Sequence, residues 1–260
     1  MTFQQALQTR RPGCDAAMPG TERQARIDLA ASYRLAAING WDDVIYTHIS
    51  MRVPGHADHF LINPFGMAFG EIKASNLVEI DHDARIVGNS EYPVNAAGFV
   101  IHSAVHRARP EIGCVMHLHT EAGMALSMMK CGLLPLSQHA MMFHNRIGHH
   151  HYEGIALDMD EQERLIADLG PHSAMILYNH GLLTAGVTVG EAYLRMFYLE
   201  KAARAQMAAM AATKDLIIPP PEVCELTAQQ HTRSNNLQLG DREWPAQLRR
   251  LDRIDPSYRE

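Results

Sequence analysis

The segment from Cys114 to Thr120, CVMHLHT, ends an apolar run on two histidines that are separated by one residue. The apolar run predicts a buried strand, in which alternate side chains project to the same face. His117 and His119 can therefore reach one point in space, while Leu118 faces the other way. Any fold of this chain has to give two neighbouring imidazoles a common environment.

Strand-like and helical patterns alternate along the rest of the chain. Helical spacing of apolar residues, with capping residues and prolines at the ends, predicts helices over 21–40, 94–110, 121–129 and 189–212. Short apolar or alternating runs predict strands over 44–53, 59–65, 76–81, 84–88, 112–120 and 173–181. This mixture favours a single α/β domain with helices layered on one sheet. We expect a flexible arm over 1–20, the domain over 21–213 and a C-terminal extension over 214–260 that wraps the body or a neighbouring subunit.

Charge and cysteine content limit the classes of molecule that the chain is expected to bind. The net charge is −6 without a block of like charges, which argues against nucleic acid and an acidic membrane surface and favours a small-molecule partner. No apolar run of about twenty residues is present, so we expect a cytoplasmic protein without a membrane segment. The four cysteines are scattered and form no C-x-x-C pair, so a metal ion would have to be held by histidine.

His180, in LYNHGLL at the end of another predicted strand, is the best third partner for this pair. Three neutral imidazoles suit zinc, manganese or iron(II) and leave positions open for water or substrate. Core histidines that only satisfy hydrogen bonds remain an alternative. Other histidine clusters point less clearly to a metal. We expect 147–154 to be a loop with His150 facing a pocket, and His102 and His106 to lie on a helix face that touches solvent or another subunit.

Several segments resemble the class II aldolase/adducin family, and they are most similar to the adducin head domain and its bacterial relatives. The likeness extends over about 23–211, and its clearest motifs are VMHLHT, NHGLLTAG, HFLINPFGM and MKCGLLPLS. It implies a three-layer α/β/α sandwich around a mostly antiparallel sheet, assembled as a homotetramer with active sites near subunit interfaces. It also implies that His117, His119 and His180 hold a divalent ion, which is zinc in the sugar-phosphate aldolases. Such an ion stabilises the enolate left when a C–C bond breaks.

The catalytic residues of those aldolases are not all retained. The position of their catalytic glutamate is occupied by Gly98. Glu91, in NSEYPVN, could take over as the acid/base. His139 falls where the aldolases carry a proton-donating tyrosine, and an imidazole can do the same work.

The phosphate-binding segments of those aldolases also differ here. Thr47-His48 replaces a Gly-Asn pair, and Phe65-Gly66 replaces a Thr-Gly pair. Larger side chains hinder the close approach of backbone amides to a phosphate, so an unphosphorylated oxo-acid fits better. The residues expected to line the substrate pocket are Thr47, His48, Asn63, Phe65 and Gly66.

These observations lead to three functional hypotheses. The first is a divalent-metal-dependent C–C lyase, an aldolase or decarboxylase, that acts on a small hydroxy- or oxo-acid or aldehyde with zinc, or with manganese or iron(II). The second is a non-haem iron(II) oxygenase or decarboxylase on the same scaffold. The third is a non-catalytic assembly module like adducin, although the long neck and lysine-rich tail of adducin are not seen in this sequence.

Overall fold

The computed structural model describes residues 20–232 and 239–260, so nearly all of the predicted N-terminal arm, 1–20, lies outside the described residues. The described residues form one eight-stranded sheet in the order β4-β3-β2-β1-β5-β8-β7-β6. Every neighbouring pair is antiparallel except β6 and β7. The strands are β1 (His48–Arg52), β2 (His59–Ile62), β3 (Val78–Asp81), β4 (Ile86–Val87), β5 (Cys114–Leu118), β6 (Gly148–His150), β7 (Ala174–Leu177) and β8 (Gly181–Gly186).

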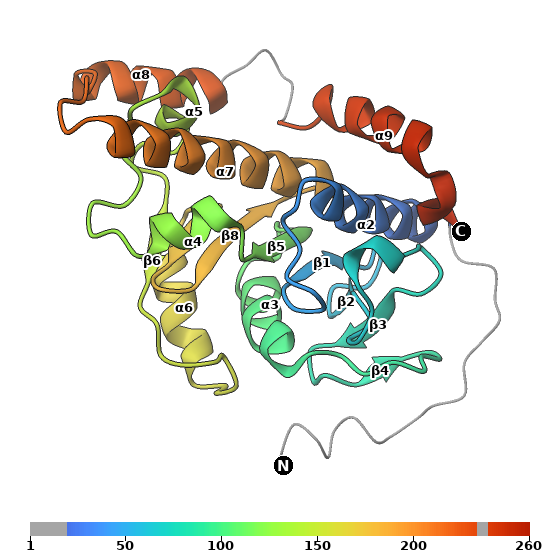
Figure 1. The fold of residues 1–260 in the computed structure, drawn as a ribbon. Coiled ribbons are helices and arrows are strands. Elements are labelled where there is room, and N and C mark those ends of the chain that lie inside the picture. Colours follow the sequence, from blue (N-terminus) through green and yellow to red (C-terminus); the bar gives the residue numbers. More distant parts are fainter. Residues whose placement is uncertain (1–19, 233–238) are drawn as a thin grey trace.

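Helices cover both faces of this sheet (Figure 1). One face packs against α2 (Gly20–Ile38), α4 (Glu121–Ser127) and α7 (Val189–Ala212). The other face packs against α3 (Ala96–Ala108) and α6 (Glu161–Leu169). The predicted three-layer α/β/α sandwich around a mostly antiparallel sheet is therefore confirmed. The remaining helices are α5 (Gln138–Met141), α8 (Pro221–Thr232) and α9 (Glu243–Ile254), with short 3₁₀ turns at Phe69–Glu71 and Pro256–Arg259.

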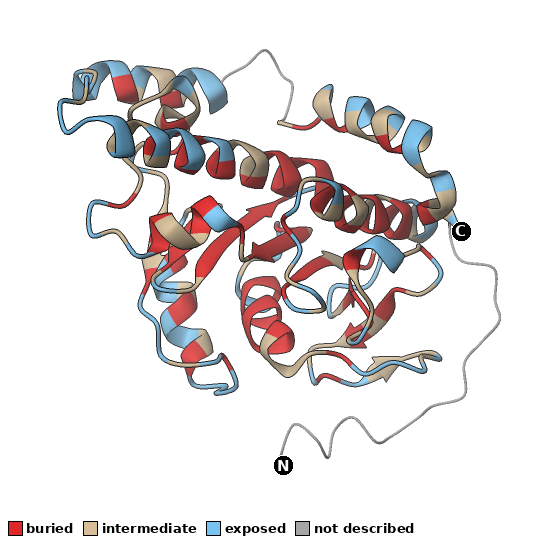
Figure 2. Ribbon diagram, viewed as in Figure 1, coloured by how far each residue is buried: buried red, intermediate tan, exposed pale blue. Residues whose placement is uncertain are grey.

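Burial is concentrated where the sheet meets the two helical layers (Figure 2). Cys114, Met116 and Leu118 belong to the apolar cluster under α2 and α7. Val115 belongs instead to the cluster under α3 and α6. This alternation along β5 is the one expected for a strand, and it places His117 on the α3 side of the sheet, opposite Leu118.

The C-terminal segment is more regular than its polar sequence suggested. It contains α8 and α9, and the Trp244 indole on α9 donates a hydrogen bond of 3.0 Å to Asp28 on α2. The guanidinium of Arg34, also on α2, lies 3.1 Å from the Asp255 carboxylate. The C-terminal residues thus pack on the outside of α2, although the predicted domain boundaries themselves stay predictions. No helix in the described ranges is both long and apolar enough to cross a membrane.

Two sequence predictions about histidines are wrong, one of them in part. Residues 148–150 form β6, which pairs with β7, whereas 151–154 lie outside any helix or strand, as predicted. His150 is buried, and its ring nitrogens lie 2.8 Å from the Asp168 carboxylate and 3.3 Å from the Glu161 carboxylate. His102 and His106 do not touch solvent either, because α3 turns them toward β1, where they are 0% and 1% exposed. Apolar spacing alone could not show that this helix buries a polar stripe.

The burial of His106 makes the stability of the fold dependent on pH. Burial lowers the pKa of His106 to about 3, with the nearby Arg52 acting in the same direction. The unfolded chain binds a proton at His106 below pH 6.5 that the folded chain excludes. Stability is therefore lost as the pH falls from about 6.5 toward 3, at a cost of about 2 kcal/mol by pH 5 for this group alone.

Denaturant unfolding at pH 7 and pH 5 tests this expectation. Between pH 7 and pH 5, we expect the free energy of unfolding to fall by about 2 kcal/mol more in the wild-type protein than in the His106→Leu variant. An equal loss in both proteins would show that the His106 imidazole is charged in the folded state or is not buried.

Candidate metal centre

Strand pairing brings three histidines to one edge of the sheet. In β5, His117 lies opposite Leu183 of β8 on one side and opposite His48 of β1 on the other. His119 follows the end of β5, and His180 directly precedes β8. Because β5 and β8 are antiparallel, the end of one lies beside the start of the other.

His117, His119 and His180, called the triad below, have the geometry of a metal site. One ring nitrogen from each residue lies within 4.8 Å of the others. The ring centroids are 5.0 Å apart for His117 and His119, 4.7 Å for His117 and His180, and 4.8 Å for His119 and His180. His117 is buried and the other two rings are partly exposed, so the triad opens toward solvent on one side.

Hydrogen bonds fix the tautomers of two triad rings. His117 Nδ1 lies 3.1 Å from the Leu182 carbonyl oxygen, which can only accept, so Nδ1 carries the proton. His119 Nδ1 lies 2.9 Å from the Asp43 carboxylate and donates to it. Each ring therefore keeps a lone pair on Nε2, and His119 Nε2 is buried without a hydrogen-bond partner. A divalent cation fits this donor set, because metal-bound histidines typically donate their other ring N–H to a carboxylate or a carbonyl.

The electrostatics of the triad also favour neutral rings. Burial, reinforced by neighbouring imidazoles, lowers the pKa of His117 well below its ordinary value. Burial and the nearby His119 and His150 lower the pKa of His180 to about 4. These two rings are therefore neutral near pH 7, which is the form that binds a metal.

The turn that carries His180 is shaped by its two neighbours. Asn179 has a positive φ of 55°, a conformation that asparagine tolerates better than most residues. At Gly181, a Cβ atom would lie 2.6 Å from the Leu118 carbonyl oxygen and 3.1 Å from His119 Cδ2. Only glycine lets β8 start this close to the end of β5, so Gly181 is required by the packing of the triad.

Thr47 and His48 lie beside the triad with unmet hydrogen-bonding capacity. The His48 ring is 5.8 Å from the His117 ring, and His48 Nδ1 is buried without a partner. The ring lies against Gly98 on α3, where a Cβ atom would be 2.7 Å from His48 Cδ2. Thr47 has a positive φ of 64°, a strained state for a β-branched residue, and its buried Oγ1 also lacks a partner. Such strain and unpaired polar atoms are typical of ligand sites.

The other three predicted substrate residues lie at the same edge. The Tyr33 hydroxyl accepts the amide hydrogens of Ile49 in β1, at 2.7 Å, and of Asn63 after β2, at 3.2 Å. Phe65 follows, and its ring is 6.1 Å from the Tyr46 ring. Gly66 has a φ of 111°, which requires glycine. His48 thus lies beside the triad, with Thr47 next to it in the chain, and Asn63, Phe65 and Gly66 directly follow β2, the strand that pairs with β1. Contact of these five residues with a substrate stays a prediction.

Neither predicted acid/base residue touches the triad. Glu91 is exposed in the loop before α3, and Pro93 of that loop accepts a hydrogen bond of 2.9 Å from the Phe65 amide. His139 lies on α5, where its ring is 5.0 Å from the Tyr198 ring of α7. In the described part of the chain, no hydrogen bond, ion pair or ring contact joins either residue to the triad. Their catalytic roles stay predictions.

The sequence analysis missed Asp43, whose carboxylate holds His119. It lies in the segment 41–47, before β1, and is partly exposed. No periodicity or motif distinguishes Asp43 from its neighbour Asp42. A search for a carboxylate near the predicted ligands would have needed the three-dimensional pairing of β1 with β5.

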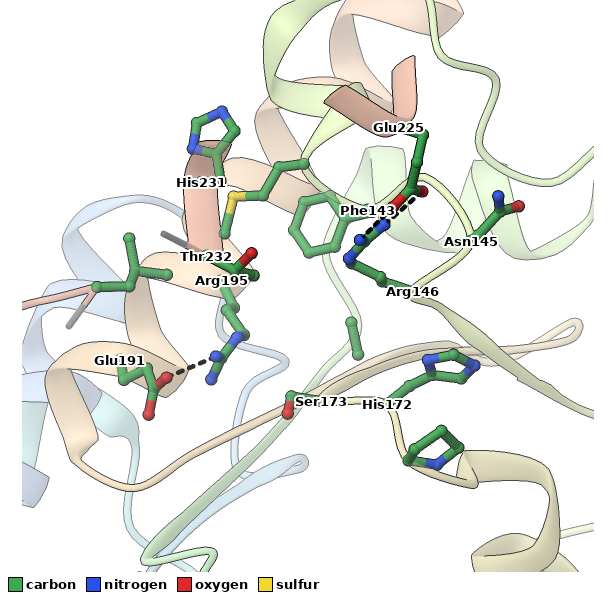
Figure 3. Close-up of a pocket in the computed structure, with 14 residues that line it drawn as sticks. Phe143, Asn145, Arg146, His172, Ser173, Glu191, Arg195, Glu225, His231 and Thr232 are labelled. Atoms are coloured by element: carbon green, nitrogen blue, oxygen red, sulfur yellow. Dashed lines mark hydrogen bonds and ion pairs between the residues drawn. The ribbon is translucent and has the colours of Figure 1, made fainter. Parts of the chain in front are cut away.

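A cavity lies away from the triad, between α7, α8 and the segment after α5 (Figure 3). Its volume is about 660 Å³, and no triad histidine lines it. Figure 3 shows that the guanidinium group of Arg146 points to Glu225 and that of Arg195 points to Glu191. The nitrogen–oxygen distances of these ion pairs are 2.7 Å and 2.5 Å. Because both arginines are already paired with carboxylates, this cavity is a weaker candidate than the triad for binding an anionic substrate.

Residues 27–207 match the family model described as the class II aldolase and adducin N-terminal domain. The chain belongs to this family. The resemblance of the VMHLHT and NHGLLTAG segments to the class II aldolase/adducin family is therefore confirmed.

Solved class II aldolase structures share the whole architecture. An aldolase II superfamily protein from Pseudomonas syringae is 48% identical with a TM-score of 0.89, over 94% of this chain and 98% of that one. An L-fuculose 1-phosphate aldolase from Glaciozyma antarctica PI12 is 28% identical with a TM-score of 0.83, over 96% of this chain and 97% of that one. Alpha-adducin of Rattus norvegicus is 38% identical over 90% of this chain, but the match spans only 34% of that protein.

Replacing Asp43 tests how the triad is held. We expect Asp43→Asn to weaken binding of Zn²⁺ by about 10- to 100-fold, because the amide no longer supports the His119 Nδ1–H as a carboxylate does. Competition with a chromophoric chelator measures this affinity. Asp42→Asn, a change at the exposed neighbouring residue, should bind Zn²⁺ like the wild type. Equal affinities in both variants would contradict the proposed support of His119.

Replacing Thr47 tests whether its strained backbone and unpaired hydroxyl lower the stability of the fold. Glycine relieves about 1 kcal/mol of left-handed strain and removes a buried unpaired hydroxyl worth about 1–3 kcal/mol, against a loss of about 1 kcal/mol in backbone entropy. We expect Thr47→Gly to be more stable by about 1 kcal/mol or more. Val44, with a φ of 54° and 72% exposure, is the matched control. Val44→Gly should change stability little, and an equal gain in both variants would contradict a special cost of the Thr47 hydroxyl.

Proposed function

We propose that this chain is a divalent-metal-dependent lyase that cleaves or forms a C–C bond next to an oxygen-bearing carbon of a small hydroxy- or oxo-acid or aldehyde. The observation that carries the proposal is the triad, with His117 Nδ1 and His119 Nδ1 both committed to hydrogen bonds. Membership of the class II aldolase and adducin family supports it. So does the likeness to an L-fuculose 1-phosphate aldolase along almost the full length of both chains.

The ion proposed for this site is Zn²⁺, with Mn²⁺ or Fe²⁺ as alternatives that neutral imidazoles also accept. When bound by His117, His119 and His180, it would supply Lewis acidity that stabilises negative charge on substrate oxygen atoms. The protein itself would orient the substrate. Thr47 Oγ1 and His48 Nδ1, both buried without partners, would form hydrogen bonds to polar groups of the bound acid. Satisfying these atoms would compensate for the strain at Thr47.

Substrate size follows from the same residues. The imidazole of His48 fills the space over Gly98, and the Phe65 ring packs near Tyr46. Both rings narrow the approach to backbone amides, which an anionic phosphate group would need. We therefore favour an unphosphorylated acid over a sugar phosphate.

Two residues, Glu91 and His139, are the candidates for the acid/base role. Glu91 lies in the loop that is hydrogen-bonded to Phe65 through Pro93, so it would act within its own subunit after the loop moves inward. His139, which packs on Tyr198 of α7, would act in the site of a neighbouring subunit of the proposed homotetramer. Sedimentation analysis at micromolar concentration tests this assembly, for which we expect four subunits. A monomer would rule out His139 as the acid/base residue, because it would have no neighbouring site to act in.

A second candidate function is a non-catalytic assembly module. The 38% identity to alpha-adducin over 90% of this chain favours it. The two functions differ in their need for a metal ion. A module needs no ion for assembly, whereas the lyase should lose activity but keep its oligomeric state when the ion is removed.

Removing triad ligands tests the proposal. Wild-type protein purified without added metal should contain about one equivalent of Zn²⁺, Mn²⁺ or Fe²⁺ per chain by elemental analysis. His117→Ala and His180→Ala should abolish binding, since each removes one of three ligands. His56→Ala is the control, because His56 is exposed in the β1–β2 loop. Unchanged metal content in both triad variants would refute the site, and iron with oxygen-dependent turnover would favour the oxygenase.

A further inference from the structure

The contact between α3 and β1 contains a row of polar side chains behind the triad. His48 and Ser50 share one face of β1, since alternate strand residues point the same way. Gly98, His102 and His106 are four residues apart and form one stripe on α3. These five residues are buried, and the four that have polar side chains are between 0% and 4% exposed. A continuous polar row at the centre of a packed interface lowers the stability of the fold unless all its polar atoms are hydrogen-bonded.

Ser50 joins the two histidines of this row. Its Oγ lies 2.6 Å from His102 Nδ1 and 2.8 Å from His106 Nε2. A hydroxyl has one hydrogen, so Ser50 donates to one ring and accepts from the other. The remaining ring nitrogens, His102 Nε2 and His106 Nδ1, are both buried without a partner. The row therefore has two open ends with a hydrogen-bonded chain between them.

The hydroxyl couples the protonation of the two rings. When Ser50 donates to His102 Nδ1, His102 carries its proton on Nε2, and His106 donates from its own Nε2. When the direction reverses, His102 Nε2 becomes bare and His106 Nδ1 carries a proton. Burial lowers the pKa of His102 well below its ordinary value and that of His106 to about 3. Both rings are therefore neutral in either arrangement near pH 7.

The two ends of the row lie in different surroundings. The His102 ring is edge-to-face with the His48 ring at 5.5 Å, and His48 is next to His117 of the triad. The His106 ring packs 5.0 Å from Phe60, and its carbonyl accepts a hydrogen bond of 2.6 Å from Arg52. The titratable and charged side chains that act on the His106 ring, besides His102, are Arg52 and His82, both partly exposed. The His106 end of the row thus lies near two partly exposed side chains, Arg52 and His82, and the His102 end lies next to His48 and the triad.

We propose that His106, Ser50 and His102 form a proton relay that supplies the edge of the sheet where the triad lies. A proton leaves His102 Nε2, the ring nitrogen that Ser50 does not hold, and is taken up by the substrate carbanion of the proposed reaction. The Ser50 hydroxyl proton then passes to His102 Nδ1, and the His106 Nε2 proton passes to Ser50 Oγ. His106 Nδ1, which is buried in the closed structure, takes up a proton from water when this end of the row opens locally. One proton enters and one leaves, and all three groups stay neutral. The purpose of the relay rests on the proposed function, because C–C cleavage leaves a carbanion that must gain a proton.

Hydrogen exchange of the His102 imidazole tests the relay without a substrate. In the full chain labelled with ¹⁵N-histidine and loaded with Zn²⁺, saturation transfer from water measures exchange of the His102 N–H, which is assigned by its absence in His102→Gln. We expect exchange to slow by about tenfold in Ser50→Ala, which breaks the chain of hydrogen bonds. Ser50→Thr restores the hydroxyl and should exchange like the wild type.

His106→Leu provides a second variant, which closes the outer end but keeps Ser50 and His102. It should slow the exchange by a similar factor of about ten. Because destabilised variants open more often, a purely structural role would make exchange faster. Unchanged or faster exchange in the variant or variants that fold would overturn the relay.

The relay and the lyase fail in different ways. Zn²⁺ content should be the same in these variants as in the wild type, because none of the replaced residues belongs to the triad. Slowed exchange in a protein without lyase turnover would support the relay and count against the proposed function. Unchanged exchange in a protein that binds Zn²⁺ and has lyase activity would reject the relay and support the proposed function.

Discussion

The pairing of β5 with β8 and β1 is the constraint on which the rest of the structure depends. It sets the end of β5 beside the start of β8, and so brings His119 to His180. It also sets His117 opposite His48. The close approach is possible because Gly181 leaves room for the Leu118 carbonyl. Any displacement of these strands by one residue would turn His117 to the opposite face of the sheet.

The α3 layer gives the two sides of β1 and β5 different chemistry. On the α2 and α7 side, Met116 and Leu118 join an apolar core that holds the sheet in place. On the α3 side, buried imidazoles and a hydroxyl replace apolar contacts, and Gly98 lets the His48 ring lie against the helix. The α3 side also contains an apolar cluster, shared with α6, so the polar side chains occupy only part of that face. This division is consistent with a scaffold shared by enzymes and by adducins.

The sequence predicted much of this arrangement, and the misses have physical reasons. Strand alternation correctly placed His117 and Leu118 on opposite faces, because the period of a strand leaves no other choice. The partners of those residues were harder to predict. Asp43 lies in an irregular segment, and its contact with His119 depends on strand pairing across seventy-six residues of separation. The buried stripe of His102 and His106 was mistaken for a surface face, because helical spacing shows which residues share a side but not what that side touches.

The central claim is that the three imidazoles bind one divalent ion. Anomalous diffraction from crystals of the protein purified without added metal, measured at the zinc, iron and manganese edges, tests it most directly. The account predicts a single strong peak per chain among the Nε2 atoms of His117, His119 and His180. No peak in that position, or a stronger one beside the histidines of β6, would contradict it.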